Sequence, residues 1–560
     1  MKPLFGIVVC WVGACGSLLA QSSYDLRAVV VGAGQESWVP GIQDQGIFGD
    51  CWTFASATAM ESNLLQSGVL PNSGTPPPIK VSSWHLSTAN GAPESLVGPN
   101  YGGSGYADWG GFEYQALGYA TRGQGSWAIP GVTANSTTNI SIMGGGPVLN
   151  SSNAHNPFPE VLVNNSPAHI GHLVPPANQP QAFLARSITM WDQGYGNNVA
   201  LPAPINPGGY TYDFTLGALD PQVQAVKAAI LANGAMTTSM NSDYSYFNYI
   251  PNGNGTYTVQ YYNPGKDPSN TDHEVTIIGW DDSYEITNGN ATSTGAWIVQ
   301  NSWGKNYWTS NTTAYENDGT FYAAYNDPSI GRTGVATFEM EPMGAYAPDV
   351  LQNELGPLSY SYYYDDGDNP MGMSALQQTK VAGLLTTPGE TTLLALGLAS
   401  QMADVDVTVK IYRDWNLGSG DPFRTETFTL EGIGYELNDL SAPINLLSGE
   451  TIVIELIYDT LGAVPVVLGG TGLNGYTTVT SGLSYYHDGS GWVDMAGLHF
   501  ASNTSGVPDI DGGVLFLKGV VAIPEPGTFV LIFLGAGLLV GRSALRGRST
   551  TARLFSRTRH

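Results

Sequence analysis

The chain has 560 residues, of which only 12% are charged, and its formal net charge is −26. Such an acidic chain lacks the basic patches with which proteins neutralise phosphate groups, so nucleic acid is excluded as a partner. Its length predicts more than one domain. The low charged fraction, with 71 Gly and 30 Tyr, is typical of an extracellular β-rich protein.

The first 20 residues have the pattern of a secretory signal. Lys2 precedes the apolar run LFGIVVCWVGACGSLLA, and cleavage near Ala20 fits this pattern. An N-terminal membrane anchor is the alternative, but the run is short for a span. Cleavage removes Cys10 and Cys15 and leaves Cys51 as the single cysteine, so we expect no intramolecular disulfide.

The segment CWTFASATAMESNLLQSG, which begins at Cys51, predicts a helix. Its apolar residues recur at mixed three- and four-residue steps, at Trp52, Ala55, Ala59 and Leu64. The N–H groups at a helix start and a neighbouring imidazolium both stabilise a thiolate. As the odd thiol of an exported chain, Cys51 is therefore a candidate nucleophile.

Three further segments follow in chain order. Residues 120–215 are rich in Asn, Pro, Gly and Ser with weak periodicity, which predicts an insertion with some local order. The segment DPQVQAVKAAILANG predicts a helix with Asp220 as its N-cap and Gly234 just past its end. The β-branched and aromatic segments HEVTIIGWDD and GAWIVQNSW each predict a strand.

A nucleophilic thiol requires a histidine, a residue that orients this histidine, and hydrogen-bond donors for the oxyanion. Of the eight histidines, His273 stands at the start of a predicted strand, where its side chain can face a cleft. Asn301 can accept the ring N–H, and Trp303 can shield this bond from water. Gln45, six residues before Cys51, can point its amide into the same cleft.

The segments QGIFGDCWTFA, DHEVTIIGW and VQNSWGKNYW together resemble the papain family of cysteine peptidases. They have the family's order Cys, His, Asn, and the resemblance extends in pieces over residues 24–330. It implies a two-lobed fold, with Cys51 as the nucleophile, His273 as the acid/base and Asn301 as its orienting residue. It also implies an oxyanion hole formed by Gln45 and the main-chain N–H of the nucleophile. This chemistry needs no metal and no cofactor.

The resemblance also assigns residues that contact the substrate. It implies that Gly110 and Gly111 align the substrate backbone, and that Asp272 and Trp303 lie beside the histidine at the edge of the cleft. In that family a His-paired cysteine has a pKa of about 3–4, which the resemblance implies for Cys51.

The chain departs from the family pattern at several places. Phe48 replaces a cysteine, which removes a disulfide, and Asp50 replaces a serine. A carboxylate at position 50 predicts a raised pKa for the neighbouring thiol. His273 follows the nucleophile by 222 residues and Asn301 by 250, against roughly 130–150 in the family. The excess fits the 120–215 insertion and a hairpin at DDSYEITNGNATSTG.

Residues 358–521 contain strand patterns between Gly, Pro, Asn and Asp turns, which predicts a β-sandwich. The segments YYYDDGDNP and VDVTVKIYRDW resemble the lectin-like domain that follows papain-type domains in some bacterial exported proteins. This domain is therefore a candidate for binding extracellular polysaccharide. Trp415 and Trp492 either stack on sugars or pack in the core. A calcium site and a solvated acidic turn are the two interpretations of the carboxylates Asp365, Asp366 and Asp368.

The C-terminal segment IPEPGTFVLIFLGAGLLVGRSALRGR sets Pro-Glu-Pro before an apolar run, Thr528 to Val540, and an arginine cluster. The run is shorter than the roughly 20 residues that cross a bilayer, and the arginines would hold the tail on the cytoplasmic side. This order resembles the PEP-CTERM sorting signal of Gram-negative bacteria; a plain membrane anchor is the alternative. Without signal and tail, residues 21–526 hold 13 basic and 46 acidic residues, a net charge of −33.

Together these features predict a signal peptide over residues 1–20, an α+β papain-like peptidase domain over 21–340, a lectin-like β-sandwich over 358–521, and a sorting segment with a hydrophobic helix over 522–560. The expected function is hydrolysis of polypeptides by an exported bacterial enzyme. We expect the C-terminal segment to anchor the enzyme transiently in the membrane. A sorting enzyme would then cleave this segment, and the protein would reach the cell surface or extracellular matrix. The alternatives are an adhesion protein on the same scaffold with little turnover, and amide transfer by the same acyl-enzyme.

Overall fold

The computed structural model describes residues 21–32, 34–43, 45, 49–71, 79–88, 111–122, 128–132, 183–191, 217–264, 271–288, 291–304, 317–342, 349–353, 374–416, 419–468, 479–500 and 510–522. The predicted signal peptide, the sorting segment, most of the 120–215 insertion and the three clustered aspartates 365, 366 and 368 lie outside the described residues. Within these described ranges, no helix is long and apolar enough to cross a membrane.

The described α-helices all lie in the N-terminal half of the chain: α2 Cys51–Gln66, α3 Ser83–Thr88, α4 Glu113–Thr121 and α5 Pro221–Asn233. The helices predicted to start at the nucleophile and at Asp220 are confirmed. The Asp220 carboxylate accepts the N–H of Gln222 at 3.0 Å, as an N-cap does. Gly234 ends α5 with a φ of +83°, and a Cβ there would lie 2.8 Å from Ser62 Oγ, so both conformation and space require glycine.

The described residues up to Pro342 contain thirteen strands: β1 Ser23–Asp25, β2 Val29–Val31, β3 Gly34–Glu36, β4 Ile79–Val81, β5 Ala128–Val132, β6 Phe183–Trp191, β7 Met236–Met240, β8 Phe247–Pro251, β9 Tyr257–Tyr261, β10 His273–Asn288, β11 Ala291–Gln300, β12 Thr320–Ala324 and β13 Val335–Pro342. A 3₁₀ turn, η4 (Tyr244–Tyr246), precedes β8. β10 and β11 pair antiparallel out to Asn288 opposite Ala291, which confirms the predicted hairpin. Their β-branched and aromatic residues suit a buried sheet.

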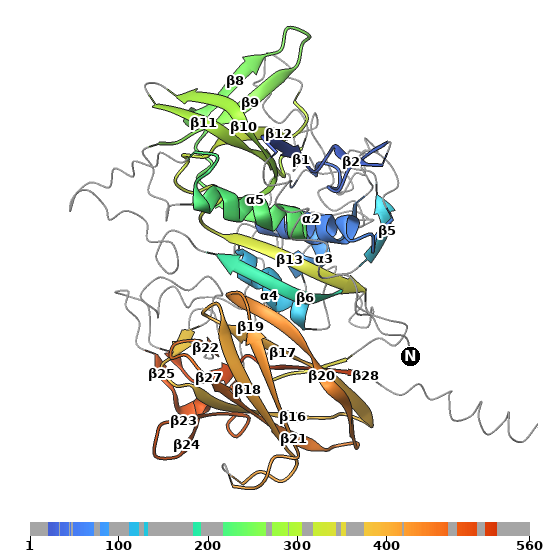
Figure 1. The fold of residues 1–560 in the computed structure, drawn as a ribbon, viewed down its shortest axis with the longest axis vertical. Coiled ribbons are helices and arrows are strands. Elements are labelled where there is room, and N and C mark those ends of the chain that lie inside the picture. The colour runs from blue at the N-terminus through green and yellow to red at the C-terminus, as the bar shows by residue number, and fades with distance from the viewer. Residues whose placement is uncertain are drawn as a thin grey trace, which may run out of the picture.

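The C-terminal half is built from strands in its described part: β14 Asp349–Leu351, β15 Ser374–Leu376, β16 Lys380–Thr386, β17 Thr391–Ser400, β18 Val405–Tyr412, β19 Arg424–Leu430, β20 Gly434–Leu446, β21 Thr451–Tyr458, β22 Val464–Leu468, β23 Ser484–His487, β24 Trp492–Asp494, β25 His499–Phe500, β26 Ile510–Asp511, β27 Gly513–Leu515 and β28 Lys518–Ala522. A 3₁₀ turn, η6 (Met495–Gly497), follows β24. The order β19-β18-β21-β16-β23-β24 forms one sheet, which faces the strands β14-β28-β17-β20 across one apolar core. This arrangement is a β-sandwich (Figure 1).

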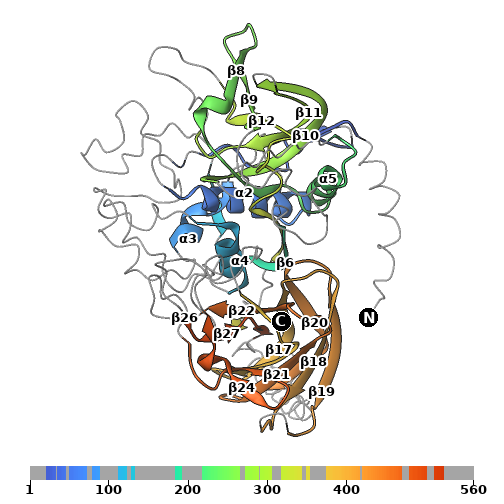
Figure 2. The same ribbon diagram turned by 90° about the vertical axis from the view of Figure 1, so that its left-hand side faces the viewer.

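One sheet runs through both halves of the molecule. Its strand order is β14-β28-β17-β20-β6-β13-β7-β10-β11-β12-β9-β8, and the halves meet where β20 pairs with β6, with Gly434 opposite Thr189. A single core cluster also spans this junction, because Leu117 of α4 packs in it together with Tyr435 and Phe516 of the sandwich. Figures 1 and 2 both show β6 next to the sandwich strands. The two halves therefore share a core as well as a sheet.

Helix α2 is buried along almost its whole length, from Trp52 to Leu65. Buried polar side chains need hydrogen-bond partners, and two of those on α2 find them on the main chain of neighbouring segments. Asn63 Oδ1 accepts the N–H of Met340 in β13 at 2.8 Å, and Ser62 Oγ accepts the N–H of Ala235 at 2.9 Å. These bonds fix the position of the helix whose first residue carries the thiol.

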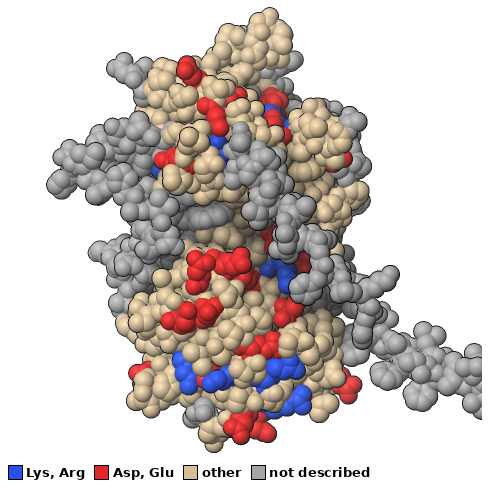
Figure 3. Space-filling model, in the orientation of Figure 1, with Lys and Arg blue, Asp and Glu red and all other residues tan. Residues whose placement is uncertain are grey.

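Charged side chains are unevenly spread on the face shown in Figure 3. Carboxyl groups gather over the sandwich, and Lys and Arg form a band towards its far end. Some of these groups of opposite charge form ion pairs, such as Arg424 with Glu426 at 3.0 Å. Pairs near the surface contribute little stability, so the shared core and sheet hold the fold together.

Candidate active site

The thiol of Cys51 lies at the start of α2. Asp50 is the N-cap of this helix, and Cys51 is its first residue. The sulfur accepts a hydrogen bond from the main-chain N–H of Glu274 in β10, with an Sγ–N distance of 3.4 Å. Among the described residues Cys51 is the free cysteine, and it is partly exposed. The helix start and the N–H both place positive partial charge at the sulfur.

The imidazole of His273 is held by three residues at the end of β11. β10 and β11 are antiparallel neighbours, so the first residue of β10 lies beside the residue that follows β11. His273 Nε2 lies 2.8 Å from Asn301 Oδ1, and this oxygen also accepts the N–H of Ser302 at 2.8 Å. Because an amide oxygen only accepts, Nε2 must carry the proton, and Nδ1 is left as the basic nitrogen. The indole of Trp303 stacks on the imidazole at a centroid distance of 4.5 Å and shields the bond.

Gln45 is tied to the same turn. Its main-chain N–H donates to the carbonyl of Ser302 at 2.7 Å, and the hydroxyl of Ser302 donates to Gln45 Oε1 at 2.5 Å. Since the carbonyl end of this amide accepts from the serine, its NH₂ end is the one that can donate to an oxyanion. Ser302 thus orients the Gln45 side chain that the sequence analysis selected, although no sequence pattern pointed to Ser302 itself.

The glycines predicted to align the substrate are described only in part. Gly110 lies outside the described residues. At Gly111 a Cβ would lie 2.4 Å from Trp52 Nε1 and 2.1 Å from Gln115 Oε1, so only glycine fits. The segment just before α4 therefore packs directly on the indole of Trp52, the residue that follows the nucleophile.

The other two residues predicted at the cleft edge have different surroundings. Asp272 is exposed, and its carboxylate accepts the main-chain N–H of Ser242 at 2.6 Å. Burial lowers the pKa of His273, and the charge of Asp272 opposes part of this shift. Trp303 is 9% exposed and lies on the histidine ring. The structure brings both next to His273; their contact with substrate stays a prediction.

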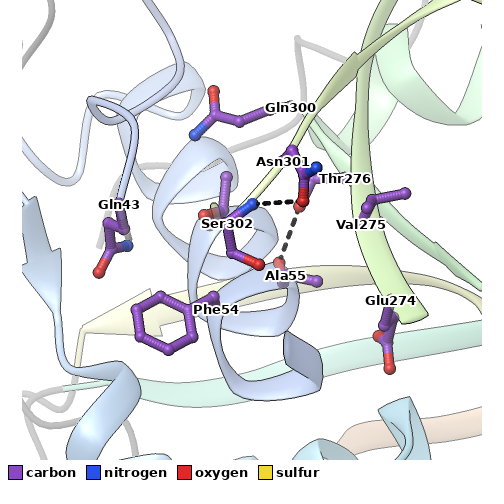
Figure 4. A pocket seen from close by; sticks show the side chains of 10 residues that line it. Gln43, Phe54, Ala55, Glu274, Val275, Thr276, Gln300, Asn301 and Ser302 are labelled. Atoms are coloured by element: carbon purple, nitrogen blue, oxygen red, sulfur yellow. Dashed lines mark hydrogen bonds between the residues drawn. The ribbon is translucent and has the colours of Figure 1, made fainter. Parts of the chain in front are cut away.

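A small pocket lies between α2, the strands β10 and β11, and the turn that follows β11 (Figure 4). Inside it Thr276 Oγ1 donates to the carbonyl of Ala55 at 3.3 Å, which ties β10 to α2. Its lining residues are Gln43, Phe54, Ala55, Thr58, Glu274, Val275, Thr276, Gln300, Asn301 and Ser302. Within the described ranges, no group of three or more His, Cys, Asp or Glu residues is placed to hold a metal ion.

The buried surroundings shift both pKa values of the candidate pair. Burial raises the pKa of the Cys51 thiol to about 12, and the negative charges of Glu274 and Asp50 contribute to this rise. Burial lowers the pKa of His273 to about 4, although its bond to Asn301 opposes this shift. Both shifts favour the uncharged pair over the thiolate that the resemblance implies. The predicted effect of Asp50 is confirmed.

The comparisons with known proteins agree with this geometry. Residues 210–320 match the family model described as papain family cysteine protease. This stretch contains His273 and Asn301 but not Cys51. No curated protein matches the chain.

Two solved structures share the fold over most of the chain. One is the clostridial cysteine protease Cwp84 after propeptide cleavage, with 16% identity and a TM-score of 0.53, covering 87% of this chain and 97% of that chain. The other contains the cysteine protease and lectin-like domains of Cwp84, a surface layer associated protein of Clostridium difficile, with 16% identity, a TM-score of 0.52, and coverage of 90% and 89%. At this identity the likeness shows a papain-like fold joined to a lectin-like domain. With the family match, it supports a peptidase.

Proposed function

We propose that this chain is an exported bacterial thiol-dependent peptidase that hydrolyses peptide bonds through a thioester on Cys51. The contact between Cys51 Sγ and the N–H of Glu274 carries this proposal. Because Glu274 directly follows His273 in β10, this contact brings the sulfur to the strand start that carries the imidazole, and Asn301 holds Nε2 of that ring. A thiol, a base and a residue that orients the base are the elements of nucleophilic catalysis.

Because Cys51 and His273 are both uncharged before the reaction, the thiol must lose its proton during its attack on the substrate. Cys51 Sγ attacks the substrate carbonyl carbon while its proton passes to His273 Nδ1. The oxyanion that forms accepts hydrogen bonds from the Gln45 amide and the main-chain N–H of the nucleophile. As the tetrahedral intermediate collapses, the imidazolium gives its proton to the leaving amine. Water, deprotonated by the same imidazole, then hydrolyses the thioester and restores the thiol.

The test compares the labelling of Cys51 by an epoxysuccinyl probe in wild type, His273→Ala and a control, His499→Ala, whose side chain is exposed in β25. We expect near-stoichiometric labelling of Cys51 that is about 10²-fold slower without the base and unchanged in the control. Cleavage of unfolded polypeptides should follow the same pattern. Slow labelling alike in all three proteins would mean an ordinary thiol and would favour the adhesion hypothesis.

We propose further that the sandwich binds extracellular polysaccharide and that the predicted terminal segments direct export, sorting and surface attachment. Trp415, Trp492 and Tyr485 form a partly buried aromatic cluster on the outer face of the six-stranded sheet, away from the sandwich core. Partly buried aromatic rings on an outer sheet face suit the apolar faces of sugars. Loss of polysaccharide retention in Trp492→Ala, measured by affinity electrophoresis, tests this; unchanged retention would contradict it.

A further inference from the structure

Glu274 is a buried carboxyl beside the nucleophile that the proposed mechanism does not use. The residue is 3% exposed, and within the described ranges neither of its carboxylate oxygens has a hydrogen-bond partner. Its main-chain N–H nevertheless contacts Cys51 Sγ. Figure 4 shows its side chain pointing away from Asn301 and Ser302. The carboxyl group is thus near the reacting sulfur, on the side away from the residues that hold the histidine.

A second buried carboxyl faces Glu274. Glu113, the first residue of α4, is 5% exposed, and its charge adds to the rise that burial produces in the pKa of Glu274. The segment just before α4 packs on helix α2, since Gly111 lies against the indole of Trp52. The starts of β10 and α4 therefore bring two carboxyl groups together.

Two buried carboxyl groups close together lower the stability of the fold. A buried carboxylate is costly unless a cation or hydrogen-bond donors accompany it, and a like charge nearby adds to the cost. Among the described residues no Lys, Arg or His forms an ion pair with Glu274. A purely structural glutamate would be paired inside the protein. Within the described part of the chain, Glu274 lacks such a cation near the reacting sulfur, where a substrate can supply one.

Resting on the peptidase function proposed above, we infer that Glu274 and Glu113 form an acidic subsite that binds a lysine or arginine side chain of the substrate. The leaving amine takes its proton from His273, so the leaving group lies on the side of Asn301. Glu274 points away from Asn301, so we assign it to the side of the acyl part of the substrate. An ammonium or guanidinium group there provides the charge-assisted hydrogen bonds that the Glu274 oxygens lack. The substrate class is therefore peptides with Lys or Arg within two residues before the scissile bond.

The test uses matched peptidyl chloromethyl ketones that carry lysine or norleucine at the first or second residue before the reactive group. Norleucine has the length of lysine without its charge. Because the lysine side chain can form charge-assisted hydrogen bonds with Glu274, we expect the wild-type full chain to react about 10- to 100-fold faster with the lysine probe than with the norleucine probe at one of the two positions. Glu274→Gln should bring this ratio close to one. Glu285→Gln, an exposed glutamate on the same strand, should keep it.

The outcomes separate the subsite from the peptidase function. Equal rates for lysine and norleucine in wild type, or an unchanged ratio in Glu274→Gln, would overturn the acidic subsite while Cys51 remains an active nucleophile. Absence of labelling by every probe would overturn the peptidase function and the subsite with it. Glu113→Gln, on a different element, gives a second measurement if Glu274→Gln fails to fold. Glu274→Asp, which keeps the charge, should keep part of the preference.

Discussion

Asp50 occupies the N-cap of α2 with 0% exposure, directly before the nucleophile. A carboxylate at this place is favourable for the helix, because a helix N-terminus carries a partial positive charge. The same charge opposes ionisation of Cys51, whose pKa it helps to raise. Asp50 thus stabilises helix α2 but disfavours the thiolate form of Cys51. The nucleophile therefore depends more strongly on proton transfer to its base, His273.

The change Asp50→Asn keeps the shape of the side chain and removes its charge. We expect the pKa of the Cys51 thiol to fall, because less negative charge then opposes the thiolate. At pH 8 alkylation by iodoacetamide should become about 3- to 10-fold faster, which corresponds to a shift of up to one pKa unit. The pH dependence of the alkylation rate measures this. Asp404→Asn, an exposed change in the sandwich, is the control; the same profile in both variants would contradict the role of Asp50.

The pKa of His273, about 4, predicts how activity depends on pH. The neutral imidazole is the basic form, and it predominates above this value. Peptidase kcat/KM should therefore be constant from about pH 5 to 9 and fall about tenfold per pH unit below about 4. No decline is expected near pH 8, since the thiol pKa is about 12. A pH profile with a peptide substrate measures this, and a decline centred near pH 8 would instead indicate an imidazolium paired with a thiolate.

At the scale of elements, α2 is held by polar bonds as much as by apolar packing. Asn63 illustrates this, because its Oδ1 accepts from Met340 in β13 at 2.8 Å and its Nδ2 donates to the carbonyl of Asn233 at the end of α5 at 3.2 Å. One side chain thus connects the helix of the nucleophile to a strand and to a second helix. The position of the thiol depends on this network.

Replacement of Asn63 by alanine should destabilise the protein. The change leaves two main-chain groups without these partners, and each costs about 1–3 kcal/mol when it is buried. We expect the free energy of unfolding to fall by about 2 kcal/mol or more, with slower labelling of Cys51 as α2 becomes less well fixed. Urea unfolding measures the stability. Asn248→Ala, an exposed change in β8, is the control, and equal stability of both variants would contradict the role of Asn63.

Local sequence patterns account for some of these elements and not for others. The caps of α5 and the hairpin of β10 and β11 follow from residues that are close in sequence, and the structure has both. The burial of Glu274 depends on α4, a distant segment, although a charge inside the apolar strand HEVTIIGW was the available signal. The outward position of Trp415 and Trp492 depends on which sheet face meets the core. An alternating pattern of apolar and polar residues cannot show which face of a sheet meets the core when both faces carry apolar residues.

At the scale of the whole molecule, the peptidase half and the sandwich form one packed body. The pairing of β20 with β6 connects strands that are far apart in the chain, which sequence periodicity cannot reveal. Arg186 and Asp439 add a bidentate ion pair at this junction, with distances of 3.0 and 2.9 Å. Because inter-domain motion is the default only where the interface is small, a shared sheet and core predict that the halves unfold together.

Gly434 is the residue at which this coupling can be tested. Its φ is +134°, and a Cβ there would lie 1.9 Å from the carbonyl oxygen of Ile188 in β6. Gly434→Ala should therefore break the pairing of β20 with β6 and separate a single thermal unfolding transition into two, as seen by calorimetry. Gly389→Ala, in the turn before β17 with open space around it, is the control and should keep one transition. If Gly434→Ala also unfolded in one step at the wild-type temperature, the halves would be held together by the side-chain core alone, and the continuous sheet would contribute nothing to their coupling.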